Sequence, residues 1–139
     1  MAENPVEIGA ITEALNSKVD TDVGNTNATG NAVIAHYAMP SDKYENVTWG
    51  SSGDKFTAPA DGYYTCTRIS TTTPQYLSIR TEDANGNALL EQAIHASGTN
   101  QYLSLTVPIA KGQRFVVFFN GSTAQNFKFI YAKGSEPQS

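Results

Sequence analysis

The chain has 139 residues, enough for one domain with a sizeable core, yet only 16% of them are charged and the net charge is −4 at pH 7. Its nine lysines and arginines are scattered, so the clustered cations that nucleic-acid binding needs are missing. No stretch approaches the roughly 20 apolar residues that cross a bilayer, and the single cysteine, Cys66, excludes an internal disulfide bond. We therefore expect neither nucleic-acid binding nor membrane insertion.

Residues 5–22 are predicted to form a helix with one narrow apolar stripe. Asn4 can cap the helix, and Pro5 suits its first position. The stripe, at spacings of 3, 4 and 4 residues, consists of Ile8, Ile11, Leu15 and Val19. A helix this short is marginal alone in water, so the stripe must pack against something. It either docks on the protein's own domain or joins several chains in a parallel coiled coil, and its narrowness favours the coil.

A segment rich in Asn, Thr and Gly follows the helix and has no hydrophobic periodicity, which predicts a linker. Gly24 is a natural helix stop. The sequence thus predicts three parts: a helix for oligomerisation or anchoring at residues 1–24, a linker at 25–31 and a head domain at 32–139. The N-terminus is acidic and lacks an apolar segment, so no secretory signal peptide is expected.

The head domain is predicted to consist of short strands separated by turn residues. The expected strands cover residues 32–38, 44–49, 55–57, 63–69, 76–81, 88–94, 102–107, 114–120 and 127–132. The sharpest turn signal is Asn85-Gly86, which is typical of a β-hairpin. About eight short strands at this spacing predict an all-β sandwich or barrel.

Residues 115–119 lack the alternation of a strand with one wet face. Phe115, Val117 and Phe119 would point to one face of the sheet. Val116 and Phe118 would point to the other. Leaving such side chains in water forgoes about 1.5–3 kcal/mol each, so either the N-terminal helix or a second copy of the chain must cover one face. The helix has only one stripe and a long linker, so we expect the second copy. The residues predicted for this subunit interface, beside the helix stripe, are Val116, Phe118, Phe127 and Phe129.

Residues 56–64, Phe-Thr-Ala-Pro-Ala-Asp-Gly-Tyr-Tyr, resemble the segment that leads into a core strand in trimeric jelly-roll heads of the complement and tumour-necrosis-factor type. Residues 103–117 resemble the leucine strand, Lys-Gly turn and valine strand of those heads, and residues 127–130 resemble their closing strand. The resemblance covers roughly residues 44–132. It implies an antiparallel jelly-roll sandwich of about eight strands in a homotrimer, with the N-terminal helices forming a coiled-coil stalk.

A second resemblance is to the distal domains of bacteriophage tail fibres and head fibres, carried by residues 14–22 and by the segments at 38–41, 50–53 and 56–60. It implies a protein of the virion surface whose helix contacts another virion protein and whose head binds a glycan or protein on the host surface. The stalk is very short, which suits a stand-alone fibre or a capsid-bound head fibre. The alternative is a structural decoration of capsid or baseplate without specific receptor binding.

Catalytic and metal-binding patterns are weak, so we expect a non-enzymatic protein without a cofactor. There is no Gly-x-Ser-x-Gly elbow, and the two histidines, His36 and His95, are far apart in sequence. One cysteine and two separated histidines make a transition-metal site improbable. Asp83, Asn85 and Asn87 have the spacing of calcium ligands, but the glycine falls at the fourth position of this segment instead of the sixth, and a hairpin turn explains it.

Recognition of a surface glycan needs exposed aromatic rings beside amides and hydroxyls. Trp49 precedes a Gly-Ser-Ser-Gly turn, while Tyr76 and Tyr102 alternate with the apolar residues Leu77 and Leu103. Each of the three rings could instead pack within the trimer. The predicted ligand-binding residues are therefore Trp49, Tyr76 and Tyr102.

Overall fold

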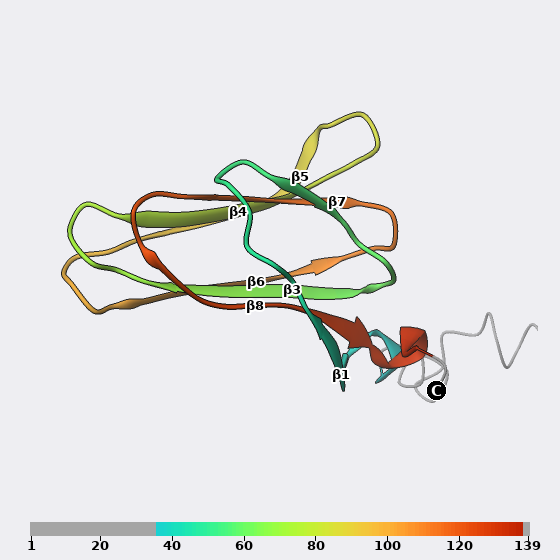
Figure 1. Ribbon diagram of the computed structural model, residues 1–139. Coiled ribbons are helices and arrows are strands. Elements are labelled where there is room, and N and C mark those ends of the chain that lie inside the picture. The colour runs from blue at the N-terminus through green and yellow to red at the C-terminus, as the bar shows by residue number, and fades with distance from the viewer. Residues whose placement is uncertain (1–35, 138–139) are drawn as a thin grey trace, which may run out of the picture. The chain divides into compact units, whose positions relative to one another are not determined.

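A computed structural model describes residues 36–137, and the strands of this part of the chain form two antiparallel four-stranded sheets (Figure 1). The strands are β1 (Pro40–Asn46), β2 (Lys55–Thr57), β3 (Gly62–Ile69), β4 (Tyr76–Glu82), β5 (Ala88–His95), β6 (Tyr102–Ile109), β7 (Arg114–Phe119) and β8 (Thr123–Ala132), and a short 3-10 helix, η2 (Lys133–Ser135), follows. The sheet orders are β1-β8-β3-β6 and β2-β7-β4-β5. This order is that of an eight-stranded jelly roll, so the predicted all-β sandwich is confirmed.

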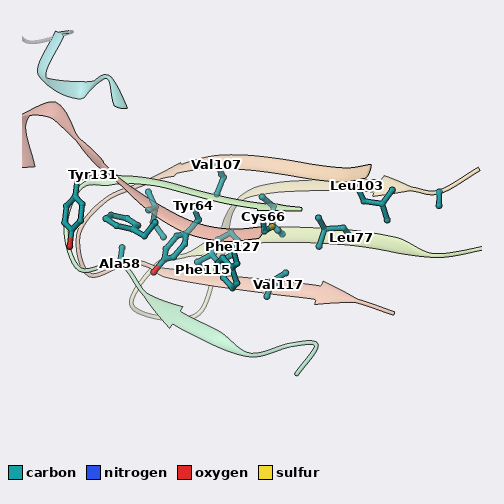
Figure 2. Packing of buried hydrophobic residues seen from close by; sticks show 14 residues of the cluster. Ala58, Tyr64, Cys66, Leu77, Leu103, Val107, Phe115, Val117, Phe127 and Tyr131 are labelled. Carbon is teal, nitrogen blue, oxygen red and sulfur yellow. The ribbon is translucent and has the colours of Figure 1, made fainter. Parts of the chain in front are cut away.

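The core lies between the two sheets and is built from strands with alternating burial. In β3, Tyr64 and Cys66 point inward, and Tyr64 stacks on Phe115 of β7 with ring centroids 4.4 Å apart (Figure 2). Cys66 is completely buried, as expected of a small apolar side chain, and this burial raises the pKa of its thiol to about 12. The thiol therefore stays protonated and unreactive at neutral pH.

The hairpin predicted at Asn85-Gly86 is confirmed between β4 and β5. Gly86 has a φ of 85°, in the left-handed region that glycine enters without strain, and its N–H donates to the carbonyl oxygen of Asp83. Both oxygens of the Asp83 carboxylate accept hydrogen bonds within the turn, from the backbone N–H groups of Asn85 and Asn87 and from the Asn87 amide. These bonds, led by the one from the Asn87 backbone, lower the pKa of Asp83. The turn therefore accounts for the segment with calcium-like spacing.

The prediction of a strand at residues 32–38 is wrong for residues 36–38, the part of this segment that the structure describes. Residues 36–38 are helical, and the first strand starts at Pro40, earlier than the start expected at residue 44. β1 is an edge strand with proline as its first residue, a position where the missing N–H is tolerated. The predicted helix, the predicted linker and the stripe residues lie outside the described residues; the stripe residues are Ile8, Ile11, Leu15 and Val19.

The two-faced character of β7 is confirmed, but the chain itself covers much of the outward face. Val116 is only 1% exposed, because its cross-strand neighbours Lys55 and Arg80 lie on either side of it. Both cations reach the Glu82 carboxylate, with Lys55 Nζ 3.0 Å from one oxygen and Arg80 Nε 2.9 Å from the other. The Arg80 guanidinium also lies 5.2 Å from the ring of Phe118, which is half-buried. Long side chains that cover apolar surface in this way remove the need for a partner at Val116.

The predicted interface therefore needs correction at three of its four head residues. Phe127 and Phe129 of β8 are 3% and 1% exposed and point into the core between the sheets. They cannot contact another copy of the chain, and neither can Val116. The prediction for Phe118 stays open, since part of its ring reaches the surface.

The Glu82 ion pairs predict a pH dependence of stability. Solvent does not reach Glu82, yet it lies on the outward face of the sheet, where the hydrogen bond from Lys55 and then that from Arg80 hold its pKa below the ordinary 4.5. A carboxylate with a lowered pKa stabilises the fold above its unfolded pKa, and this stabilisation is lost as the pH falls through the folded pKa. Glu82→Gln should therefore lower the Tm at pH 7, and its difference from the wild type should shrink between pH 5 and pH 3 in thermal unfolding followed by circular dichroism. A difference that is constant over this range would show that the charge of Glu82 is not stabilising.

Candidate functional site

Three of the loops at one end of the sandwich contain no charged residue. We call them the distal loops: residues 70–75 between β3 and β4, 96–101 between β5 and β6, and 120–122 between β7 and β8. They lie together at the left of Figure 1, whereas Pro40 and η2 lie at the opposite end. Their side chains are serine, threonine, asparagine and glutamine with a few small residues. Loops of this kind on a rigid sheet scaffold are frequent binding sites.

Buried polar side chains hold the distal loops in place. Ser70 is fully buried, and its Oγ accepts the N–H of Gln101 at 2.9 Å and donates to the carbonyl oxygen of Gly98 at 2.7 Å. Gln75 is 4% exposed, and its Oε1 accepts the N–H of Thr71 at 2.8 Å while its Nε2 donates to the Thr71 hydroxyl at 2.9 Å. Each loop conformation is thus fixed by a side chain that water does not reach.

The third distal loop is tied to the first. The Asn120 side-chain oxygen accepts the N–H of Tyr76 at 2.9 Å, and the Thr71 hydroxyl donates to the carbonyl oxygen of Gly121. Gly121 has a φ of 49°, and a Cβ atom there would lie 2.7 Å from Nε2 of Gln75. A side chain at this position would be strained by the left-handed backbone and would displace the Gln75 amide. The surface made by the distal loops is ordered before any ligand arrives, which limits the entropy lost on binding.

The structure brings Tyr76 and Tyr102 to this end of the sandwich but places them on opposite faces. They are the first residues of β4 and β6 and directly follow two of the distal loops. Tyr102 is 65% exposed, whereas Tyr76 is half-buried with its ring centroid 6.0 Å from that of His95. Packed sheets are about 10 Å apart, so the two rings cannot form one stacking platform. Tyr102 is the more accessible of the predicted ligand-binding residues.

Trp49 belongs to the edge of the core. It lies in the loop between β1 and β2, and its ring centroid is 4.8 Å from Phe127 and 5.5 Å from Phe119. The guanidinium carbon of Arg68 lies 4.7 Å from the centre of the Trp49 ring. These contacts leave Trp49 half-buried, so its ring is a poor platform for a ligand. Trp49 is therefore a packing residue, which was the alternative to ligand binding. Its packing contacts lie within one chain and not between the chains of a trimer.

Two pairs of hydroxyl groups next to Tyr102 were not predicted from the sequence. On the outward face of β3 and β6, the hydroxyls of Thr65 and Thr106 lie 2.7 Å apart, and those of Thr67 and Ser104 lie 2.8 Å apart. We call these four residues the hydroxyl row. Each pair uses only one of its two O–H donors internally, so the second hydrogen and the remaining lone pairs are available to a ligand. The alternation of polar residues in both strands is the signal in the sequence, but their pairing follows only from the register.

The register places Tyr102 at the end of the hydroxyl row, beside Ile69 of β3 and next to the distal loop at 96–101. Around Tyr102 the surface combines an exposed aromatic ring with neutral donors and acceptors, and Lys128, the cross-strand neighbour of Thr65, is a charged side chain at the far end of the row. The hydrogen bonds and stacking around Tyr102 suit an uncharged ligand that carries many hydroxyl groups. Within residues 36–137, no three His, Cys, Asp or Glu side chains gather as metal ligands would, and no helix there has the length and apolar character of a membrane span.

Comparison with known proteins gives structural similarity at low sequence identity. No family model matches the chain, and no curated protein matches it. A family 6 carbohydrate-binding module whose binding subsites were dissected by crystallography and calorimetry is 13% identical, covers 66% of this chain and 84% of its own, and has a TM-score of 0.35. The module CBM6cm-2 of Cellvibrio mixtus lichenase 5A, in complex with cellotriose, is 20% identical over 70% of this chain and 92% of its own, with a TM-score of 0.31. At these TM-scores the similarity assigns neither a family nor a ligand to this chain.

Proposed function

We propose that this protein is a non-enzymatic attachment module whose distal end binds a neutral glycan on a cell surface. The observation that carries the proposal is Tyr102, 65% exposed beside the uncharged distal loops and at the end of the hydroxyl row. An aromatic ring supplies a rigid apolar platform for the face of a sugar ring. Neutral hydroxyls and amides then exchange hydrogen bonds with sugar hydroxyls, and they do not require a charged ligand.

The proposal extends to the setting of the protein. The resemblance to phage fibres supports a place on the virion surface, with residues 1–24 bound to another virion protein. The same resemblance and the narrow stripe of the N-terminal segment support a homotrimer. β1 begins at the end of the sandwich opposite the distal loops. A head attached through that end leaves the distal loops accessible to a host surface.

Tyr102→Ala is the substitution that tests this function, and Tyr44→Ala is its matched control. Tyr44 is 53% exposed on the outward face of the same sheet, but it lies in β1 with Lys128 Nζ 4.3 Å from its ring centre. On an array of neutral and acidic oligosaccharides, we expect the wild type to bind neutral glycans. Tyr102→Ala should weaken that binding about tenfold, since the stacking surface is lost, which corresponds to ~1.4 kcal/mol. Tyr44→Ala should leave binding unchanged.

Equal binding by the wild type and Tyr102→Ala would remove the distal end as the glycan site. Binding of acidic glycans alone would contradict recognition by neutral groups. Failure of the wild type to bind any glycan, together with retained incorporation into particles, would favour the structural decoration role instead.

A further inference from the structure

A pocket of about 550 Å³ opens at the end of the sandwich opposite the distal loops. Its walls come from segments that are far apart in sequence: Tyr37, Asp61 with the first residues of β3, the end of β6 at Pro108, the turn at Gln113, and Gly134 of η2. Its volume lies in the range of about 300–1,000 Å³ that small-molecule sites occupy. It shares no residue with the distal loops or the hydroxyl row.

Asp61 gives the pocket its charge. Among the described residues that line the pocket, it is the one with a formal charge. Its Oδ1 accepts the backbone N–H of Lys111 at 2.8 Å, which fixes the carboxylate at the pocket wall. The ion pairs found within residues 36–137 do not include Asp61, so its negative charge is not neutralised by a side chain there. Asp61 therefore places one negative charge in the lining of the pocket, which favours a cationic group beside it over an anionic one.

Close packing of β3 against β8 fixes the position of Asp61. A Cβ atom at Gly62 would collide with the carbonyl oxygen of Ile130 and lie 2.6 Å from the ring of Phe129, so the approach requires glycine. The carbonyl oxygen of Asp61 accepts the N–H of Ala132 at 3.0 Å. The backbone that carries the Asp61 carboxylate is thus held on two sides, and such a fixed position is what a ligand-binding group requires.

Two tyrosine rings supply the apolar part of the wall. The O–H of Tyr63 donates to the carbonyl oxygen of Ala38 at 2.6 Å, so its polar end is occupied and its ring remains as lining. Tyr37 is 54% exposed and packs beside Gly134, where an added Cβ atom would lie 3.0 Å from the Tyr37 Cβ. Aromatic rings near a carboxylate attract a cation through the ring quadrupole as well as through the charge.

We propose that this pocket binds an organic ammonium ion, such as an amino sugar or a short alkylamine. The ammonium group pairs with Asp61, and the body of the ligand packs against Tyr37, Tyr63 and Pro108. The Gln113 side-chain oxygen is used by the N–H of Ala110 at 3.2 Å, which leaves its amide N–H groups to donate to a hydroxyl of the ligand. This site does not depend on the neutral-glycan site at the distal end.

The test is a titration of the full chain followed by NMR at the backbone amides of Gly62 and Ala110. The probes are glucosamine, glucose as its uncharged counterpart, and butylammonium as a cation without a sugar ring. We expect saturable shifts with glucosamine and with butylammonium, since both carry the ammonium group, and none with glucose. Asp61→Asn keeps an oxygen for the Lys111 N–H but removes the charge, and it should weaken glucosamine binding at least about fivefold. Tyr102→Ala, which affects only the distal site, should leave these shifts unchanged.

Three results would overturn the proposal. Equal shifts with glucose and glucosamine would show that the pocket recognises a sugar ring without its charge. Full binding by Asp61→Asn would show that the carboxylate does not take part. No saturable shift with either cationic probe would show that the pocket does not bind ammonium ions, whatever the outcome at Tyr102.

Discussion

Phe115→Ala should lower the free energy of unfolding by about 3–5 kcal/mol, whereas Phe118→Ala, on the same strand, should lower it by about 1 kcal/mol. Phe115 is completely buried and stacks on Tyr64 at the centre of the core, so its removal leaves a cavity between the two sheets. Phe118 points to the outward face of β7, and only part of its ring is covered by the chain. Urea unfolding of both variants at pH 7 measures the two free energies.

Equal losses for the two variants would contradict the assignment of the β7 faces. Phe118→Ala also decides a question that the sequence raised. Because Arg80 already lies beside Phe118, we expect the mass of the full chain in solution, measured by light scattering, to be the same with and without the substitution. A lower mass would place Phe118 in a subunit interface, as the sequence predicted.

Arg68→Ala should destabilise the fold by about 3 kcal/mol, because Arg68 organises the core next to the distal loops. Arg68 carries a charge, yet it points inward from β3 and is only 6% exposed. This burial lowers the pKa of its guanidinium. The guanidinium carbon lies 3.8 Å from the centre of the Phe119 ring, Nε donates to the Ser122 hydroxyl at 2.7 Å, and a terminal nitrogen donates to the Ser122 carbonyl oxygen. Alanine would leave a cavity beside Phe119 and Trp49 and remove the two donors to the hydroxyl and carbonyl oxygens of Ser122. Thermal and urea unfolding measure the loss.

Arg68→Met is the control for this prediction, because methionine keeps an unbranched side chain of similar length without the charge. Its cost should be less than half that of alanine, since the apolar stem is retained and the charge no longer has to be desolvated. Methionine as damaging as alanine would instead show that the hydrogen bonds to Ser122, not the packing, carry the contribution of Arg68.

The sequence predicted the strands well because turn residues mark their ends. The Asn85-Gly86 hairpin and the alternation in β4 and β6 needed only local information. The strand prediction failed at residues 36–38, which are helical, because a short apolar stretch does not separate helix from strand. The faces of β7 were predicted correctly, but the cover over Val116 was not. That cover comes from Lys55 and Arg80, whose place beside Val116 depends on the order of strands in the sheet.

The same limit applies to the candidate site. The exposure of Tyr102 could be predicted because this residue alternates with the buried Leu103. The hydroxyl row could not, since Thr65 meets Thr106 only once β3 pairs with β6. Trp49 follows a strand and precedes a turn in the sequence, and nothing there shows that its ring folds back onto Phe127. The pocket at Asp61 combines residues from five segments and has no signal in any one of them.

The most direct test of glycan binding at the distal end is an NMR titration of the full chain with the neutral oligosaccharide that binds most strongly on the array. Backbone amide shifts should change saturably in the distal loop at 96–101, at Tyr102 and along the hydroxyl row, while the amides of β7 stay unchanged. Shifts confined to the outward face of β7, or to Gly62 and Ala110 at the opposite end, would contradict the account, because the glycan would then bind away from Tyr102.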